Sequence, residues 1–132
     1  MKLSQSSVHG ILAALYIATH EKEGSVATRV IAEECGLPPI HLTKILQQLA
    51  RYRLVSGTQG PGGGFTLVKP AGQITLLEMI EAVEGPVEVE PMSREVTKVS
   101  KHSREKFKAV CTDIRDYARA RLGKTTIKQL MG

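Results

Sequence analysis

The sequence predicts a mainly α-helical fold with a small β-hairpin, arranged as a winged helix-turn-helix with a long C-terminal dimerisation helix. Residues 55–70, VSGTQGPGGGFTLVKP, place two short apolar strands on either side of a glycine-rich turn. The segment just before them, HLTKILQQLARYRL, has the spacing of a helix with one polar face. A helix followed at once by a hairpin is the order of a recognition helix and its wing.

Three helices are expected before the hairpin. Residues 6–19 have apolar side chains at i, i+3, i+4 and i+7 after a serine-rich start, which predicts an amphipathic helix. Residues 27–35 form a short second helix that Gly36 ends. Leu37-Pro38-Pro39 opens the third helix, because the first helical turn does not use the N–H that proline lacks. The inward positions of this third helix are Leu42, Ile45, Leu46 and Leu49.

Two further helices and a short final one are expected after the hairpin. Thr75-Leu-Leu-Glu78 is a capping box for a fourth helix that runs to about Val83 and stops at Gly85-Pro86. A long helix is predicted over 103–122, and Thr126 with Gln129 would cap a short one. The chain therefore divides into a winged helix-turn-helix domain (1–85), a variable loop without periodicity (86–102), and a dimerisation helix with a C-terminal helix (103–132).

Composition limits the class of protein. The 132 residues carry a net charge of +5, which modestly favours a polyanionic partner. The two cysteines, Cys35 and Cys111, lie far apart in predicted helices, so a disulfide framework is not expected. The N-terminus lacks an uninterrupted signal-peptide core, and no apolar run approaches membrane-spanning length. A soluble cytoplasmic protein without a membrane partner is therefore expected.

The polar face of the third helix is the first candidate site. Gln47 and Gln48 can each pair with adenine through two hydrogen bonds, and Lys44 can reach guanine or a phosphate. Thr43 offers both a hydroxyl and a methyl group. The alternative is a solvated helix face without a ligand, and the wing that follows makes this alternative less favourable.

The glycine turn, Gly60-Pro61-Gly62-Gly63-Gly64, is the second candidate site. A nucleotide-phosphate loop would lie between a strand and a helix and would be followed by Lys and Ser/Thr. This turn lies between two strands, so a wing fits better, with glycines that permit positive φ and close approach to DNA phosphates. The complete set of residues expected to bind DNA is Lys2, Ser4, Thr28, Pro39, His41, Thr43, Lys44, Gln47, Gln48, Arg51, Gln59, Gly60, Pro61, Gly62 and Gly63.

Neither a catalytic site nor a metal site is expected. The four histidines show no metal-ligand spacing with one another or with the cysteines, and no nucleophilic triad or carboxylate pair is recognisable. Cys35 is expected to be a small core side chain. Cys111 is expected to pack within its helix stripe, with a redox role as the alternative, because basic neighbours would lower its pKa.

An apolar stripe runs along the predicted long helix and is expected to be buried against another surface. Its members are Phe107, Val110, Cys111, Ile114, Tyr117, Ala118 and Leu122. Packing against its own domain is one alternative. Pairing with the same helix of a second copy suits a DNA-binding protein better, because two-fold symmetry places two recognition helices in successive grooves. The stripe therefore predicts a homodimer on a palindromic operator.

Five segments of the chain together resemble a known family. They are MKLS, IAEECGL, HLTKILQQLARYRLVSGTQGPGGGFTL, ITLLEMIEAVEG and TTIKQL, and they cover nearly the whole chain. The family is the Rrf-two family of IscR-like winged helix-turn-helix regulators. The resemblance implies a bacterial transcriptional regulator, held as a homodimer by crossed long helices and bound to operator DNA.

The chain departs from this family pattern in three places. Cluster-binding members carry three cysteines before the long helix, whereas PVEVEPMSREVTKVSKHSREKF has none. An iron–sulfur cluster needs several thiolate ligands, so neither a cluster nor another cofactor is expected. Gln59 stands where the family often has Arg, and His41-Leu42-Thr43 stands where it often has Tyr-Leu-Glu. Both changes concern the operator sequence rather than DNA binding itself.

Two functions of different classes remain. The first is a sequence-specific transcriptional regulator, expected to act as a repressor. The alternative is a winged-helix interaction module that docks a metabolic enzyme through the acidic segment 78–95. Control of the regulator would come from a small ligand, a partner protein or oxidation of Cys111, in that order.

Overall fold

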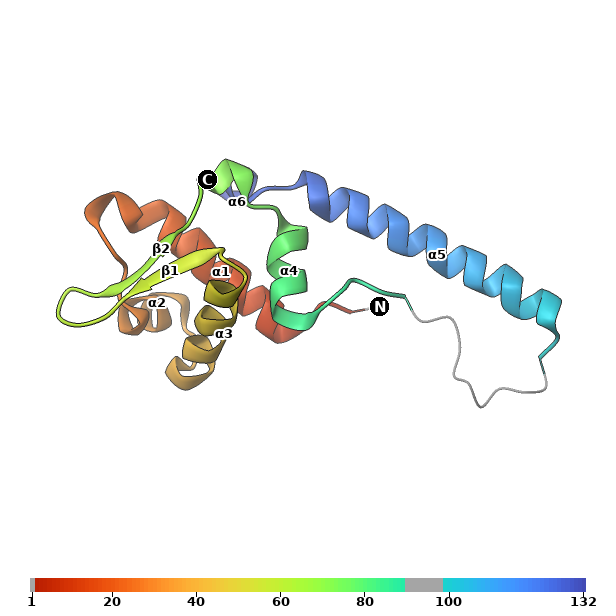
Figure 1. The fold of residues 1–132 in the computed structure, drawn as a ribbon, viewed down its shortest axis with the longest axis horizontal. Coiled ribbons are helices and arrows are strands. Elements are labelled where there is room, and N and C mark those ends of the chain that lie inside the picture. Colours follow the sequence, from red (N-terminus) through yellow and green to blue (C-terminus); the bar gives the residue numbers. More distant parts are fainter. Residues whose placement is uncertain (1, 90–98) are drawn as a thin grey trace.

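The computed structural model of the protein describes residues 2–89 and 99–132, and Figure 1 shows a helical body from which one long helix extends. The body contains α1 (Gln5–His20), α2 (Thr28–Cys35), α3 (Pro39–Arg51), the strands β1 (Val55–Thr58) and β2 (Gly64–Leu67), and α4 (Leu76–Glu84). The long helix is α5 (Lys101–Lys124), followed by α6 (Ile127–Leu130), and short 3₁₀ helices, η1 (Glu21–Glu23) and η2 (Ala71–Gln73), join other elements. The predicted fold class is confirmed.

The helix ends follow the capping signals in the sequence. Gly36 ends α2 in the left-handed region at φ 66. Thr75 and Glu78 form the predicted capping box of α4, and Thr126 with Gln129 forms the one that opens α6. The start of α5 was predicted two residues too late, because the Ser100 side chain caps the helix by accepting from the Ser103 N–H. Residues 90–98 of the predicted loop lie outside the described residues.

A single core forms around α1. Its inner face carries the small or compact residues Gly10, Ala13, Ala14 and Ile17, all buried. A Cβ atom at Gly10 would lie 3.3 Å from Ile45 Cγ2 of α3, so the missing side chain lets the two helices approach closely. The four predicted inward positions of α3 are all buried, which confirms the direction of its polar face.

The hairpin is joined to the body along its outer edge. β1 and β2 pair antiparallel, from Val55 opposite Leu67 to Thr58 opposite Gly64. Val26, just before α2, adds a bridge to β2: its N–H donates to the Phe65 carbonyl at 3.0 Å, and its carbonyl accepts from the Phe65 N–H at 2.8 Å. A Cβ atom at Gly64 would lie 2.3 Å from the Val26 carbonyl oxygen, so this approach requires glycine.

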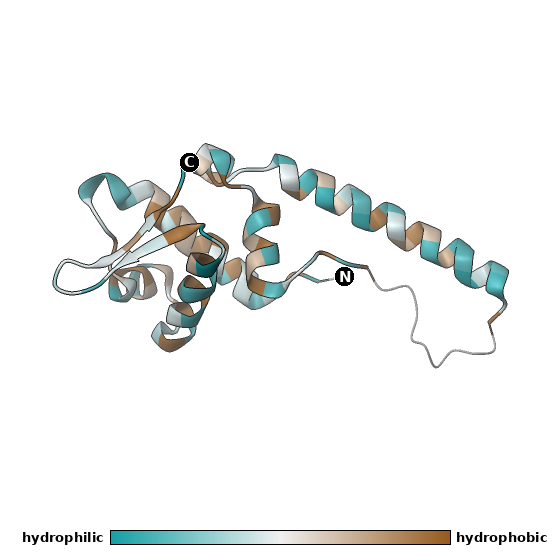
Figure 2. Ribbon diagram, in the orientation of Figure 1, coloured by the Kyte–Doolittle hydropathy of each residue, from teal (hydrophilic) through white to brown (hydrophobic). Residues whose placement is uncertain are grey.

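The end of the chain holds the base of the long helix. The Ile127 side chain is buried in the core, and its N–H donates to the Ile74 carbonyl at 2.9 Å. The Leu76 N–H donates to the Thr125 carbonyl at 2.9 Å. Arg119 Nη1 of α5 also lies 2.8 Å from Glu81 Oε2 of α4. Consequently α5 leaves the body from a fixed base, with apolar residues recurring along it (Figure 2).

Arg53 generates a stability prediction. It has φ 59 at the corner between α3 and β1, a conformation that costs a residue with a Cβ atom about 1–2 kcal/mol. We expect Arg53→Gly to raise the free energy of unfolding by about 0.5–1 kcal/mol, since the greater freedom of glycine in the unfolded chain offsets part of the gain. Urea denaturation followed by circular dichroism measures this. Arg53→Ala is the matched control, because it removes the same side chain but keeps the strain, and it should not be stabilised. A lower stability for Arg53→Gly would contradict the prediction.

Candidate nucleic-acid interface

A groove separates the recognition helix from the wing. It has a volume of about 500 Å³. Its lining residues are Gln47, Ala50 and Arg51 from α3, and Gly57, Thr58, Gln59, Gly64 and Phe65 from the hairpin. The structure therefore brings together three predicted site residues from separate segments: Gln47, Arg51 and Gln59.

The exposed face of α3 carries most of the predicted base-reading side chains. Thr43, Lys44, Gln47 and Arg51 are all exposed. The Thr43 hydroxyl donates to the Pro39 carbonyl at 2.9 Å and keeps its lone pairs for an outside donor. Lys44 makes no ion pair with any other residue in the described ranges. Donors and acceptors for base edges are thus available along this face.

Gln48 does not share this face with Gln47. Its side chain is half-buried, and Nε2 donates to the Val83 carbonyl of α4 at 3.2 Å. One residue turns a helix by about 100°, which carries Gln48 from the exposed face toward the body. The geometry therefore removes Gln48 from the base-reading set and makes it a link between α3 and α4.

The first turn of α3 is tied to α1. His41 is half-buried, and its Nε2 lies 3.1 Å from the Ser6 hydroxyl oxygen. Its ring also meets the His9 ring edge to face, with centroids 5.5 Å apart. Pro39, two residues earlier, is exposed at the start of the helix. The recognition helix is thus oriented by polar contacts at its start and by apolar packing beyond.

The glycines of the wing have two different roles. Gly60 and Gly62 have φ values of 88 and 77, so they supply a conformation that side chains rarely adopt. Gly63 has no such φ, but a Cβ atom there would lie 2.3 Å from the Thr58 carbonyl oxygen. With the exposed residues Gln59 and Pro61, they form a tip that other backbones can approach closely.

The three remaining predicted site residues lie near the starts of α1 and α2. The Ser4 hydroxyl caps α1 by accepting from the Ser7 N–H, while the Ser4 N–H donates to Glu84 Oε2 at 3.0 Å. Burial acts to raise the pKa of Glu84, but hydrogen bonds from Ser7 and Ser4 outweigh it and bring that pKa below its ordinary value. Thr28 is half-buried as the first residue of α2, and Lys2 is exposed beside a cavity.

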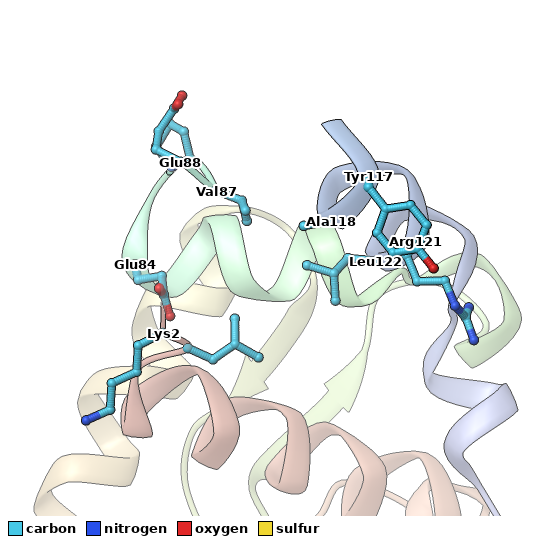
Figure 3. A pocket seen from close by; sticks show the side chains of 10 residues that line it. Lys2, Glu84, Val87, Glu88, Tyr117, Ala118, Arg121 and Leu122 are labelled. Atoms are coloured by element: carbon cyan, nitrogen blue, oxygen red, sulfur yellow. The ribbon is translucent and has the colours of Figure 1, made fainter. Parts of the chain in front are cut away.

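That cavity lies between the residues that precede α1, the end of α4 with the residues that follow it, and α5. It has a volume of about 510 Å³. Figure 3 shows Val87, Ala118 and Leu122 facing it, with Glu84 and Arg121 at its edge. Leu3 completes the apolar wall. The cavity therefore continues the apolar stripe of α5 into the body.

The stripe itself is largely uncovered in a single chain. Phe107 is 44% exposed, Val110 54%, Ile114 42% and Tyr117 73%. Such a row of large apolar side chains is costly in water and is typical of an interaction surface. Packing against its own domain, the alternative considered from the sequence, leaves these four residues exposed, whereas Cys111 is buried.

Comparison with known proteins decides the family. The sequence profile of the Rrf2 family, described as "Iron-dependent Transcriptional regulator", matches residues 3–132. The chain belongs to the Rrf2 family. The HTH-type transcriptional regulator IscR of Xenorhabdus nematophila is 35% identical over 88 residues, which make up 67% of this chain and 54% of that protein. The chain thus spans about half the length of the curated relatives it matches.

Solved structures of Rrf2 regulators share the fold. CymR (YrzC), the global cysteine regulator of B. subtilis, superposes with a TM-score of 0.78 at 25% identity, covering 98% of this chain and 95% of that one. The oxidized form of Staphylococcus aureus CymR gives the same TM-score at 26% identity, with coverages of 98% and 95%. As a member of the Rrf2 family, the chain has the winged helix-turn-helix fold of these regulators.

The cysteines of this Rrf2 protein do not fit an iron–sulfur cluster. The sequence has two, Cys35 on α2 and Cys111 on α5, and Figure 1 shows these helices at opposite parts of the molecule. Burial and the nearby Glu34 carboxylate raise the pKa of the Cys35 thiol, which keeps it protonated. In the part of the chain that the structure describes, no three potential metal ligands come together.

The acidic segment proposed for docking an enzyme is engaged within the chain. Glu78 Oε1 lies 2.7 Å from Lys69 Nζ, and Glu88 Oε2 lies 3.8 Å from Arg115 Nη1. Glu81 pairs with Arg119, and Glu84 accepts from Ser4, the N-cap of α1, and from Ser7 within it. The remaining acids of the segment, Glu90 and Glu95, lie outside the described residues. The described part of this surface therefore gives no support to the interaction-module alternative.

Some lining residues of the groove were missed from the sequence. Ala50, Thr58 and Phe65 face it, yet none is a side chain that signals DNA contact. The strand register places Phe65 opposite Gly57, whose missing side chain leaves room for the ring, and this glycine is the sequence signal for Phe65; no such signal exists for Ala50 or Thr58. None of the helices in the described ranges is long and apolar enough to cross a membrane.

Proposed function

We propose that this Rrf2 protein is a homodimeric repressor that binds a palindromic operator. The observation that carries the proposal is the groove between α3 and the wing, which gathers Gln47, Arg51 and Gln59 from separate segments. An exposed helix face beside a glycine-tipped hairpin matches the way such proteins place a helix in the major groove and a wing on the adjacent backbone.

The residues divide between sequence reading and positioning. Lys44 and Gln47 present donors and acceptors to base edges, and each good contact is worth about 1–3 kcal/mol of discrimination. Arg51 and the backbone of the wing tip approach phosphates, which fixes the register on the duplex. Binding to the DNA upstream of the chain's own gene should therefore weaken as salt rises. Footprinting on that fragment tests the proposal, and a protein that protects no sequence would overturn it.

Dimerisation supplies the second recognition helix. The exposed stripe of Phe107, Val110, Ile114 and Tyr117 and the adjoining apolar cavity form one continuous surface for a second copy. Two-fold symmetry would then set the two α3 helices about 34 Å apart, as successive major grooves require. A bound dimer over a promoter, in the bacterial cytoplasm, would block transcription.

The first prediction from this proposed function distinguishes the role of Gln47 from that of Gln48. Lys44→Ala and Gln47→Ala should each weaken operator binding by about 1–3 kcal/mol, because each removes a base contact. Gln48→Ala is the matched control, since the same amide one position later faces α4. It should bind DNA like the unmodified protein. Fluorescence anisotropy on the footprinted fragment measures all three, and equal effects at 47 and 48 would show that the reading face is misassigned.

The second prediction concerns the dimer. Ile114→Asp should convert the protein to a monomer, because a carboxylate on the stripe would be buried against the partner at a cost of several kcal/mol. Ala109→Asp places the same charge on α5 about 140° away around the helix and should leave the dimer intact. Light scattering reports the mass of each. A monomeric unmodified protein would remove both the dimer and the palindromic operator.

The third prediction concerns the signal. Reconstitution with iron and sulfide under anaerobic conditions should leave the protein colourless and still able to bind DNA, since two separated cysteines cannot hold a cluster. A broad visible absorbance after reconstitution would contradict this. Control would come from a small ligand, for which the cavity of about 510 Å³ is large enough, or from a partner protein.

Oxidation of Cys111 is the remaining route, and it has its own measurement. An oxidized form of the S. aureus relative has been crystallised, which supports testing it. Cys111 is buried, so its reaction with an oxidant should be slow. Titrating peroxide against the unmodified protein and Cys111→Ser, and following DNA affinity in both, decides the matter. Identical sensitivity in the two proteins would exclude Cys111 as the sensor.

A further inference from the structure

A side chain, rather than a strand, completes the outer edge of the wing. In β2, alternate N–H groups point away from β1, so Phe65 and Leu67 both direct theirs to the outer edge. The Phe65 N–H is taken by the Val26 carbonyl at 2.8 Å. The Leu67 N–H donates to Oε2 of Glu21 at 2.9 Å, across 46 positions of sequence. The carboxylate thus stands where the next carbonyl of a neighbouring strand would lie.

This bond has a mechanical consequence for the hairpin. Val26 joins the outer edge of β2 to the body by backbone hydrogen bonds at one point, Phe65. Glu21 adds a second point two residues along the same strand, near the base of the wing. Hydrogen bonds at two points on one edge of β2 fix the direction of the hairpin relative to the body. The partly buried Leu67 N–H has no other acceptor among the described residues, so loss of the carboxylate would leave it unpaired.

The position of Glu21 links this direction to the body. Glu21 is the first residue of η1, directly after α1, and α1 carries the core on which α3 packs. The Glu21 carboxylate therefore fixes the orientation of the wing relative to α1, the same helix against which the recognition helix packs. The groove between α3 and the wing, which Gln47 and Gln59 line, takes its width from both.

We infer that Glu21 is a positioning residue for DNA binding: its carboxylate aims the wing without touching DNA itself. The inference rests on the proposed function, in which the wing contacts the operator. It also departs from the usual expectation for a negative charge in a DNA-binding domain, because loss of this hydrogen-bond acceptor weakens binding even though it also removes the charge.

Substitutions at Glu21 separate the hydrogen bond from the charge. Glu21→Gln removes the charge but keeps an oxygen that accepts from the Leu67 N–H, whereas Glu21→Ala removes both. We expect Glu21→Ala to bind the footprinted fragment about three- to ten-fold more weakly, and Glu21→Gln to stay within about two-fold of the unmodified protein. Glu23→Ala, at an exposed glutamate of the same 3₁₀ helix, is the matched control and should bind normally.

Two further measurements keep the test decisive. Glu21→Leu fills the space without an acceptor and should bind as weakly as Glu21→Ala, even if the alanine variant folds poorly. Amide exchange at Leu67, followed by NMR, should accelerate in Ala and Leu but not in Gln. Tighter binding by both Ala and Gln, or unchanged binding by Ala and Leu, would overturn the inference while leaving the proposed function intact. An unmodified protein that binds no DNA would overturn the proposed function and this inference with it.

Discussion

The close approach of α3 to α1 is the constraint on which the rest of the structure depends. Gly10, Ala13 and Ala14 give α1 a face without large side chains, and Ile45 of α3 comes to the position where a Cβ atom of Gly10 would be tight. Packing at this distance fixes the rotation of α3 about its own axis. Lys44 and Gln47 consequently face solvent and Gln48 reaches α4. A bulkier α1 would move the reading face as a whole.

Local signals predicted the elements well because each is encoded by nearby residues. The capping boxes at Thr75 and Thr126, the αL glycine at Gly36 and the apolar spacing of α3 all act within one or two helical turns. Together they yield the order of helices and the hairpin, and hence the winged fold. The polar face of α3 and the glycine tip of the wing follow from the same signals, so the main parts of the candidate site were also predictable.

Hydrogen bonds between residues far apart in sequence were not predictable, because no local sequence pattern indicates which residues will be partners. Val26 and Glu21 lie between the first two predicted helices, and no strand pattern or other local signal there points to β2. Gln48 has the same chemistry as Gln47, and only the position of Val83, 35 residues away, gives it a different partner. Ser4 was likewise expected to bind DNA, and only the fold shows that its N–H donates to Glu84. In each case the role of the residue depends on a backbone group or a carboxylate that is distant in the sequence.

The return of the C-terminal residues to the core makes α5 a lever. With Thr125 and Ile127 hydrogen-bonded to the body, the helix is held at its C-terminal end, while Phe107 and Val110 lie toward the other end. Its 24 residues span about 36 Å, so a rotation of about 5° at the base moves the far end by about 3 Å. Ala118 and Leu122, which wall the cavity in Figure 3, lie close to the fulcrum. Small changes in packing there are therefore magnified at the distant tip of the arm.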